Sequence, residues 1–139
     1  MKYTTFLTAL FVVPAALAAT VSVSYDQVYD QSSNSLATVA CSDGSNGLLT
    51  KGFTTFGSLP SFPNIGGAPA VGGWNSPACG TCWRLAFNGT SINVLAIDTG
   101  AAGFNIALTA FNKLTNGQGI AIGRINANAT QVNASVCGL

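Results

Sequence analysis

The sequence predicts one mainly β domain that closes into a barrel of about six short strands with one or two short helices. Two apolar, β-branched runs, residues 83–87 and 91–97, flank Asn88-Gly89, which is a strong hairpin signal. Residues 20–25 alternate apolar and polar side chains with the period of a half-buried strand. Because closing a sheet removes its exposed edges, we expect a barrel rather than an open sheet.

The first half of the chain is rich in turn-forming residues, so we expect mostly turns and loops there. Residues 36–41 predict a second short strand, and residues 41–47 form a turn cluster with two glycines that can take positive φ. Residues 48–56 can hold one helical turn. Residues 57–78 are rich in Gly and Pro, so they predict a long loop, which in a small domain is usually functional or anchored.

The second half of the chain carries clearer apolar patterns. Residues 107–114 have the spacing of one short helix. Residues 119–125 alternate again, and residues 126–132 predict the last strand. The aromatic residues within the periodic segments, which we assign to the core, are Trp83, Phe87 and Phe111.

The N-terminal segment, residues 1–18, is predicted to be a secretory signal peptide. Lys2 supplies the positive region, residues 6–17 the apolar region, and Ala16-Leu17-Ala18 a small-x-small cleavage site. The apolar stretch is shorter than the roughly 20 residues that span a bilayer, so a membrane anchor is disfavoured. We expect one domain at residues 19–139, secreted to the extracellular space or cell wall. Permissive N-glycosylation sequons begin at Asn88, Asn128 and Asn133.

The four cysteines of this predicted secreted domain suggest two disulfides, for which three connectivities exist. Cys79 and Cys82 form a Cys-x-x-Cys motif, which can be redox-active when a following helix N-terminus lowers the pKa of a thiol. Here an apolar, strand-like run follows the motif instead of a helix, which disfavours a redox role. Long loops favour Cys41–Cys79 with Cys82–Cys137, since each such bridge would stabilise by about 4 kcal/mol in the chain-entropy model. Composition alone leaves the other connectivities open.

The composition excludes several classes of function. The chain has no His and no Glu, which excludes Ser-His-Asp and Cys-His catalysis and removes the commonest zinc ligand, so no metal or cofactor is expected. Charged residues make up 6% of the chain, against roughly 25% in ordinary domains, and the cations are scattered. We therefore expect neutral polymers, sugars or interfaces as partners, and no nucleic acid. The acidic residues are Asp26, Asp30, Asp43 and Asp98.

Several segments together resemble the cerato-platanins, a family of small secreted fungal proteins. The resemblance spans the chain from about residue 19 to residue 137, and its most specific part is the Cys-Gly-Thr-Cys-Trp run with Gly-Phe-Asn downstream. The segments that carry it are Val21-Ser22-Val23-Ser24-Tyr25-Asp26, Cys41-Ser42-Asp43-Gly44 with Asn46-Gly47-Leu48, Phe62-Pro63-Asn64-Ile65-Gly66-Gly67, Gly73-Trp74-Asn75-Ser76-Pro77, Cys79-Gly80-Thr81-Cys82-Trp83, and Asp98 followed by Gly103-Phe104-Asn105.

The resemblance implies a six-stranded double-ψ β-barrel like the first domain of expansins, and it implies the pairs Cys41–Cys79 and Cys82–Cys137. It also implies binding of chitin-type N-acetylglucosamine oligomers and loosening of cell-wall polysaccharide without hydrolysis. Self-association at surfaces and recognition by a host receptor as a defence elicitor are implied as well.

Asp98 is the strongest candidate for chemistry, because it follows an apolar strand and precedes the flexible Thr99-Gly100 turn. Glycoside hydrolysis normally needs two carboxyl groups, and the sequence shows no obvious partner for Asp98. We therefore expect Asp98 to bind sugar hydroxyls rather than to act as a catalytic residue. Local hydrogen bonds within the turn, or weak hydrolysis by Asp98, are the alternatives.

Neutral sugars are held by aromatic faces and fixed hydrogen-bonding groups, and we predict that five residues line one shallow groove. Tyr25 ends a strand, and the Asn105 amide can both donate and accept hydrogen bonds. The alternative for the Asp43-Gly44 turn is a purely structural role. Trp74 lies in the Gly- and Pro-rich loop, and we favour docking on the core over a position that contacts sugar. Phe104 is expected to lie near the groove. The predicted ligand-binding residues are Tyr25, Asp43, Gly44, Asp98 and Asn105.

Overall fold

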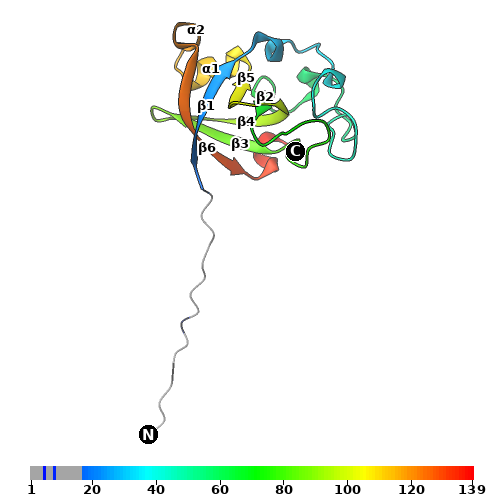
Figure 1. Cartoon of the computed structure of the whole chain (residues 1–139), viewed down its shortest axis with the longest axis horizontal. Coiled ribbons are helices and arrows are strands. Elements are labelled where there is room, and N and C mark those ends of the chain that lie inside the picture. Colours follow the sequence, from blue (N-terminus) through cyan, green and yellow to red (C-terminus); the bar gives the residue numbers. More distant parts are fainter. Residues whose placement is uncertain (1–4, 6–7, 9–16) are drawn as a thin grey trace.

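Six strands close into a barrel in the order β1-β5-β2-β4-β3-β6 (Figure 1). The computed structural model describes Thr5, Thr8 and residues 17–139, so the predicted signal segment lies almost wholly outside the described residues. The closed, mainly β barrel confirms the predicted fold class. The strands are β1 Ala19–Tyr25, β2 Ile65–Ala68, β3 Cys82–Phe87, β4 Thr90–Thr99, β5 Phe104–Ile106 and β6 Arg124–Val132.

The barrel combines one tight hairpin with pairings between distant segments. β3 and β4 are antiparallel and joined at Asn88-Gly89, whose φ values of 45° and 79° fit the predicted hairpin turn. β1 pairs in parallel with β5, and β2 in parallel with β4. Parallel neighbours need long connections, which explains why much of the chain lies in loops between the strands.

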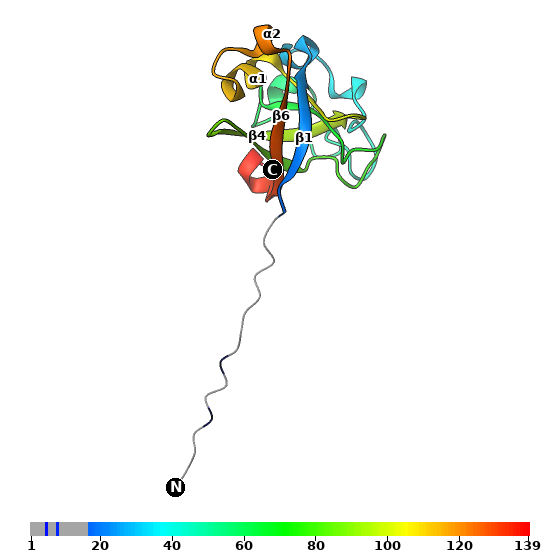
Figure 2. The ribbon, with the colours of Figure 1, turned by 60° about the vertical axis from the view of Figure 1, so that its left-hand side comes forward.

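Two helices cover one end of the barrel, away from the end at which β1 begins (Figure 2). They are α1 Leu108–Leu114 and α2 Gly119–Ile122. Asp30 caps α1 from a distant segment, since its carboxylate accepts hydrogen bonds from Leu108 N at 2.8 Å and Thr109 N at 2.9 Å. No helix in the described part of the chain is long and apolar enough to cross a bilayer. Short 3₁₀ turns are η1 Gln27–Asp30, η2 Leu36–Thr38, η3 Phe56–Ser58 and η4 Ala134–Cys137.

Two of the predicted strands are wrong. Residues 36–41 begin with the turn η2, because the Ser35 hydroxyl accepts a hydrogen bond from Ala37 N and starts a 3₁₀ turn. Residues 119–125 begin with α2, and the last strand starts at Arg124. The predicted helix at 107–114 is confirmed as α1.

The barrel interior is apolar, and Phe111 is fully buried as predicted. Trp83 and Phe87 are half-buried and pack against the core from its edge. The remaining large, fully buried side chains include Leu36, Leu48, Phe56, Ile65, Leu85, Leu95, Ile97, Ile106 and Leu114.

Two disulfides attach the long loops to the barrel, and they are the predicted pairs. Cys41 is bonded to Cys79 and Cys82 to Cys137, with sequence separations of 38 and 55 residues. Loops of this length correspond to about 4 kcal/mol of stabilisation each in the chain-entropy model. Backbone hydrogen bonds from Cys41 N to Ile97 O and from Gly80 N to Ala96 O hold the same segments against β4.

The short strand β2 lies between β4 and β5 because it has no side chains at its centre. A Cβ on Gly66 would collide with the Asn105 carbonyl, and one on Gly67 with the Thr99 carbonyl. Glycine at both positions therefore allows the three backbones to approach closely enough to pair.

We expect Gly67→Ala to lower the free energy of unfolding by about 1–3 kcal/mol, because the added methyl group must push β2 away from β4. Gly72→Ala is the matched control, since a Cβ there has nothing within 4 Å. Guanidinium chloride unfolding of both variants measures the difference. Equal stability of the two would contradict the requirement for close approach at β2.

Candidate functional site

A line of paired positions crosses five strands of the barrel. Gly67 on β2 pairs with Asp98 on β4 and with Asn105 on β5. Asn105 pairs with Ser24 on β1, which in turn pairs with Arg124 on β6. We call these five positions the polar row. Strand pairing thus places two of the predicted ligand residues, Asp98 and Asn105, on either side of one glycine.

A cavity of about 200 Å³ opens beside the polar row, lined by Ser24, Asn105, Arg124 and the loop between β4 and β5. The Asn105 Oδ1 accepts a hydrogen bond from the Ser24 hydroxyl at 3.2 Å. Within the described part of the chain, the Asn105 amide nitrogen makes no hydrogen bond. The guanidinium of Arg124 donates to Ser22 at 2.6 Å through one nitrogen, which leaves its other donors for a ligand.

The carboxylate of Asp98 is hydrogen-bonded to three groups of the protein and is not among the residues that line this cavity. Its Oδ2 accepts from the Tyr29 hydroxyl at 2.9 Å, and its Oδ1 accepts from Ala40 N at 3.0 Å and Thr99 N at 2.9 Å. These bonds tie the segment after β1 to the end of β4. The structure therefore assigns Asp98 an internal anchoring role, and its contact with a ligand stays a prediction.

Tyr29 was not singled out from the sequence, since it lies in a polar, turn-rich stretch. Its ring is buried and stacks against Phe56, with ring centroids 6.1 Å apart. Burial raises the pKa of Tyr29 well above its ordinary value of 10.0, and the neighbouring Asp98 carboxylate raises it further.

Asp43 and Gly44 belong to a different group of residues, which we call the Trp74 cluster. The Trp74 indole N–H donates to Asp43 at 2.6 Å, and Asn46 N donates to the Asn75 side chain at 2.8 Å. Gly44 has φ of +82°, and a Cβ there would collide with Asn75 and press on the Trp74 ring. The indole hydrogen bond is the main reason that the pKa of Asp43 is lowered.

The prediction that Trp74 docks on the core is wrong, because its side chain is 63% exposed. Its hydrogen-bond acceptor, Asp43, lies on an exposed turn, and Gly44 leaves the space in which the indole rests. The partner residue is 31 positions away, so no local pattern could indicate this arrangement.

The two remaining aromatic candidates are Tyr25, which is half-buried, and Phe104, which is one of the residues that line the cavity beside the polar row. Tyr25 packs against Phe111 with ring centroids 5.5 Å apart, and strand alternation places it on the face of β1 opposite to Ser24. Phe104 is 2% exposed and contacts the Trp83 ring edge-on at 5.8 Å. The five predicted ligand-binding residues therefore do not form one groove. Asp98 and Asn105 lie in the polar row, Asp43 and Gly44 belong to the Trp74 cluster, and Tyr25 packs against Phe111 of α1.

All four carboxylates of the protein already accept hydrogen bonds from its own groups. Asp26 accepts from Val28 N, and Asp30 caps α1. Asp43 holds Trp74, and Asp98 holds Tyr29. Among the described residues, no group of three His, Cys, Asp or Glu side chains could hold a metal ion. The cavity beside the polar row thus offers amide and hydroxyl groups and one guanidinium, and no carboxylate is among its lining side chains.

We expect Tyr29→Phe to lower the free energy of unfolding near neutral pH by roughly 2 kcal/mol, because it removes a hydrogen bond to a carboxylate. The same substitution should also remove a loss of stability that the wild type shows at high pH. As the pH rises above 10.0, Tyr29 ionises in the unfolded chain before it does in the folded one, so wild-type stability falls. The variant lacks this contribution, and the stability gap should narrow at high pH in chemical denaturation. A constant gap would contradict the raised pKa.

We expect Trp74→Phe to raise the pKa of Asp43 toward its ordinary value, since the variant lacks the indole N–H that stabilises the carboxylate. Carboxyl-carbon NMR titration of the wild type and the variant measures this shift. An unchanged Asp43 pKa would mean that the indole hydrogen bond is not formed in solution.

Comparison with known proteins agrees with the fold and with these motifs. The cerato-platanin family model matches residues 21–139. Allergen Asp f 15 of Aspergillus fumigatus is 46% identical over 149 residues, which cover 99% of this chain and 97% of that protein. Cerato-platanin of Ceratocystis fimbriata f. sp. platani is 45% identical over 124 residues, covering 88% of this chain and 90% of that protein.

Solved structures show the same barrel. The crystal structure of cerato-platanin 2 from M. perniciosa has a TM-score of 0.83 and 49% identity, covering 87% of this chain and all (100%) of that one. The solution structure of the fungal elicitor cerato-platanin has a TM-score of 0.77 and 45% identity, covering 84% and 96%. The sequence motifs, the barrel and both disulfides thus lead to one assignment: the chain belongs to the cerato-platanin family.

Proposed function

We propose that this protein is a secreted, non-catalytic cell-wall protein that binds chitin-type N-acetylglucosamine oligomers and loosens polysaccharide without hydrolysis. The observation that carries the proposal is the polar row, where the free amide nitrogen of Asn105 and the guanidinium of Arg124 border an open cavity. N-acetylglucosamine presents a carbonyl acceptor and several hydroxyls, which these donors and the Ser24 hydroxyl complement.

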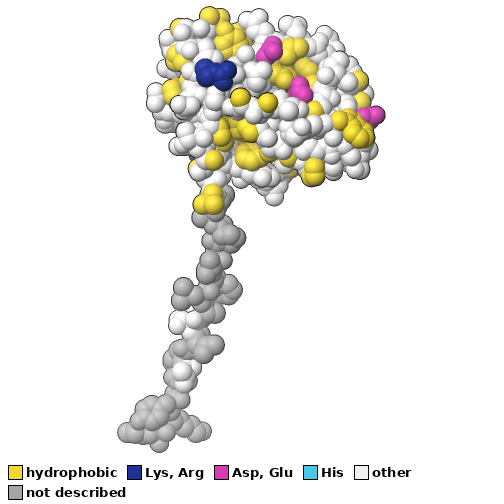
Figure 3. Space-filling view, in the orientation of Figure 1, with side chains coloured by type: hydrophobic (Ala, Val, Ile, Leu, Met, Phe, Trp, Pro, Cys, Tyr) yellow, Lys and Arg dark blue, Asp and Glu magenta, His cyan; other side chains and the backbone are white. Residues whose placement is uncertain are grey.

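The size and charge of the surface also favour a neutral chain as ligand. The cavity of about 200 Å³ is smaller than the 300–1,000 Å³ typical of closed ligand pockets, so we place one sugar ring in it. The neighbouring rings of an oligomer then lie on the exposed barrel surface. Few Lys, Arg or Asp side chains lie on the face seen in Figure 3, and the proposed ligand is neutral, so binding should depend little on ionic strength.

The Trp74 cluster supplies an aromatic face for the same class of ligand. An exposed indole costs little conformational entropy on binding when its orientation is already set, here by Asp43. In this proposal, Asp43 and Gly44 act indirectly: they hold and accommodate Trp74, and the ring contacts the sugar.

A non-catalytic role is supported by what the carboxylates already do. Asp98 accepts three hydrogen bonds from the protein, and Asp30 accepts backbone hydrogen bonds at the start of α1. Hydrolysis by a pair of carboxyl groups would need one acid and one base or nucleophile at the same bond. Release of reducing ends that Asp98→Asn abolishes, while the variant keeps its fold, would establish the enzyme alternative.

Recognition by a host is the second part of the proposal. One relative, cerato-platanin, is described as a fungal elicitor, and another, Asp f 15, as an allergen. Both terms describe proteins that a host detects. We therefore propose that the secreted protein is also bound by a host receptor.

An apolar surface favours a second candidate function, self-association at interfaces. An apolar surface hollow has Val21, Pro69, Ala70 and Trp83 in its lining, which stay in the domain after the predicted cleavage, together with Leu17, which does not. Such surface on a small secreted domain favours adsorption where water meets an apolar phase. Film formation at an air–water surface, compared between wild type and Val21→Ser, tests it.

We expect Asn105→Ala to weaken binding of N-acetylglucosamine oligomers about 5- to 10-fold, which corresponds to the loss of one hydrogen bond. Isotherms with N-acetylglucosamine and cello-oligomers of increasing length measure the effect. Gln131→Ala is the matched control, because it removes an exposed amide elsewhere on the barrel. The proposal fails if Asn105→Ala and Gln131→Ala bind equally well.

A further inference from the structure

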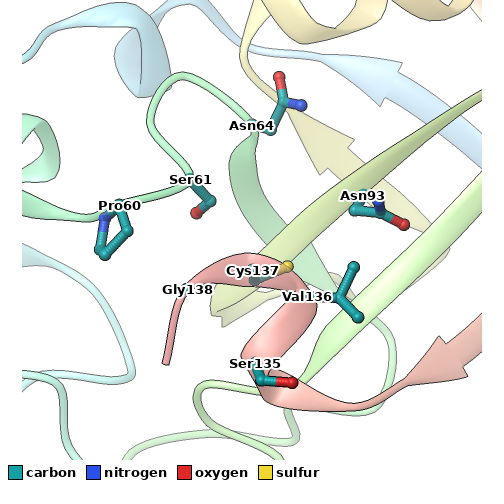
Figure 4. Close-up of a pocket in the computed structure, with 8 residues that line it drawn as sticks. All are labelled: Pro60, Ser61, Asn64, Asn93, Ser135, Val136, Cys137 and Gly138. Carbon is teal, nitrogen blue, oxygen red and sulfur yellow. The ribbon is translucent and has the colours of Figure 1, made fainter.

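A third cavity, of about 340 Å³, lies between η4 and the start of β2 (Figure 4). Its polar lining comes from Ser61, Asn64, Asn93 and Ser135, and we call it the Ser61 cleft. Asn93 precedes Asp98 by five residues on β4, which corresponds to about 17 Å at the rise of a strand. None of the residues that line this cleft also lines the cavity beside the polar row.

Ser61 carries the strongest sign of a missing partner. Its Oγ is the only buried side-chain nitrogen or oxygen in the described part of the chain that has no hydrogen-bond partner. Leaving such an atom unsatisfied costs roughly 1–3 kcal/mol, so native proteins rarely tolerate it without a reason. Figure 4 shows Ser61 facing η4 across the cleft.

The other polar groups of the cleft are also available. Among the described residues, neither the Asn93 amide nor the Ser135 hydroxyl takes part in a side-chain hydrogen bond. Asn64 has only a long contact, in which Lys113 Nζ donates to its Oδ1 at 3.5 Å. The cleft therefore combines two amides and two hydroxyls with free hydrogen-bonding capacity.

The chemistry of the lining selects the ligand class. No charged side chain lines the cleft, which disfavours an anion or a cation, and four polar side chains disfavour a purely apolar ligand. Val136, 53% exposed, adds one apolar contact at the rim. A neutral ring with several hydroxyls fits this set, and 340 Å³ is at the lower end of the range for small-molecule pockets.

We propose that the Ser61 cleft is a second binding site, which takes one neutral pyranose ring of a polysaccharide. It rests on the proposed function for its ligand class but uses none of the same residues. Two separate sites on one rigid barrel allow a single molecule to hold two polysaccharide chains, or two points of one chain. Linking two weak contacts in this way raises the overall affinity for a polymer without any new contact.

Backbone amide NMR titration with N-acetylglucosamine, its trimer and glucose tests the proposal. We expect two groups of amides to shift, one near Ser24 and Asn105 and the other near Asn64, Asn93 and Ser135. Shifts confined to the first group would overturn the second site while leaving the proposed function intact. Shifts confined to the second group would support the cleft and contradict the polar row.

Ser61→Ala separates binding from folding. Because the hydroxyl makes no hydrogen bond to another group of the protein, its removal should leave thermal stability unchanged or higher. In the same variant, we expect the dissociation constant for sugar, measured from the amide shifts of Asn64 and Asn93, to rise at least 5-fold. The sugar-induced shifts of the Asn105 amide should not change. Ser91→Ala, an exposed serine on the same strand as Asn93, is the control.

Three results would overturn the proposal. One is an unchanged dissociation constant at the cleft in both Ser61→Ala and Asn93→Ala. Another is a crystal soaked with sugar in which Ser61 is hydrogen-bonded to water and not to sugar, together with an NMR titration in which the cleft amides do not shift. The third is a larger response of the cleft amides to inorganic phosphate than to sugar, which would assign the cleft to an anion beside Lys113.

Discussion

The close approach of β2 to β4 and β5 is the constraint on which both the barrel and the polar row depend. Gly66 and Gly67 present bare backbone where a Cβ would collide with the carbonyls of Asn105 and Thr99. The resulting register places Asp98 and Asn105 on either side of Gly67. Strands β4 and β5, which do not pair with each other, thus contribute to one surface line, because the two central glycines of β2 lie between them.

Scarcity of charge shapes the chemistry of this protein. Its four carboxylates cap turns and helices, orient an indole and anchor a buried phenol. A carboxylate used in this way replaces hydrogen bonds to water with hydrogen bonds to the protein, which stabilises loops that have little apolar surface of their own. The outer surface keeps amides and hydroxyls, which complement neutral ligands through directional hydrogen bonds rather than long-range attraction.

The long loops are held at both ends by interactions that span much of the chain. The disulfide Cys41–Cys79 and the hydrogen bonds of Asp98 attach residues 26–80 to β4. The disulfide Cys82–Cys137 likewise places η4 beside β3 and so forms one wall of the Ser61 cleft. A site made of such loops keeps its shape before a ligand arrives, which lowers the entropy lost on binding.

The sequence by itself determined the elements whose signals are local, namely the Asn88-Gly89 hairpin, the alternating strand β1 and the helix α1. Its lack of histidine and glutamate also excluded several kinds of catalysis. Only the tertiary structure decided β2 and β5, which are too short to show a periodic pattern and form because neighbouring strands pair with them. It also decided the exposure of Trp74, the partners of Asp98 and the unsatisfied hydroxyl of Ser61. Asp98 bonds to groups 69 and 58 residues away, and Trp74 to one 31 residues away, so their environments arise only when distant segments meet.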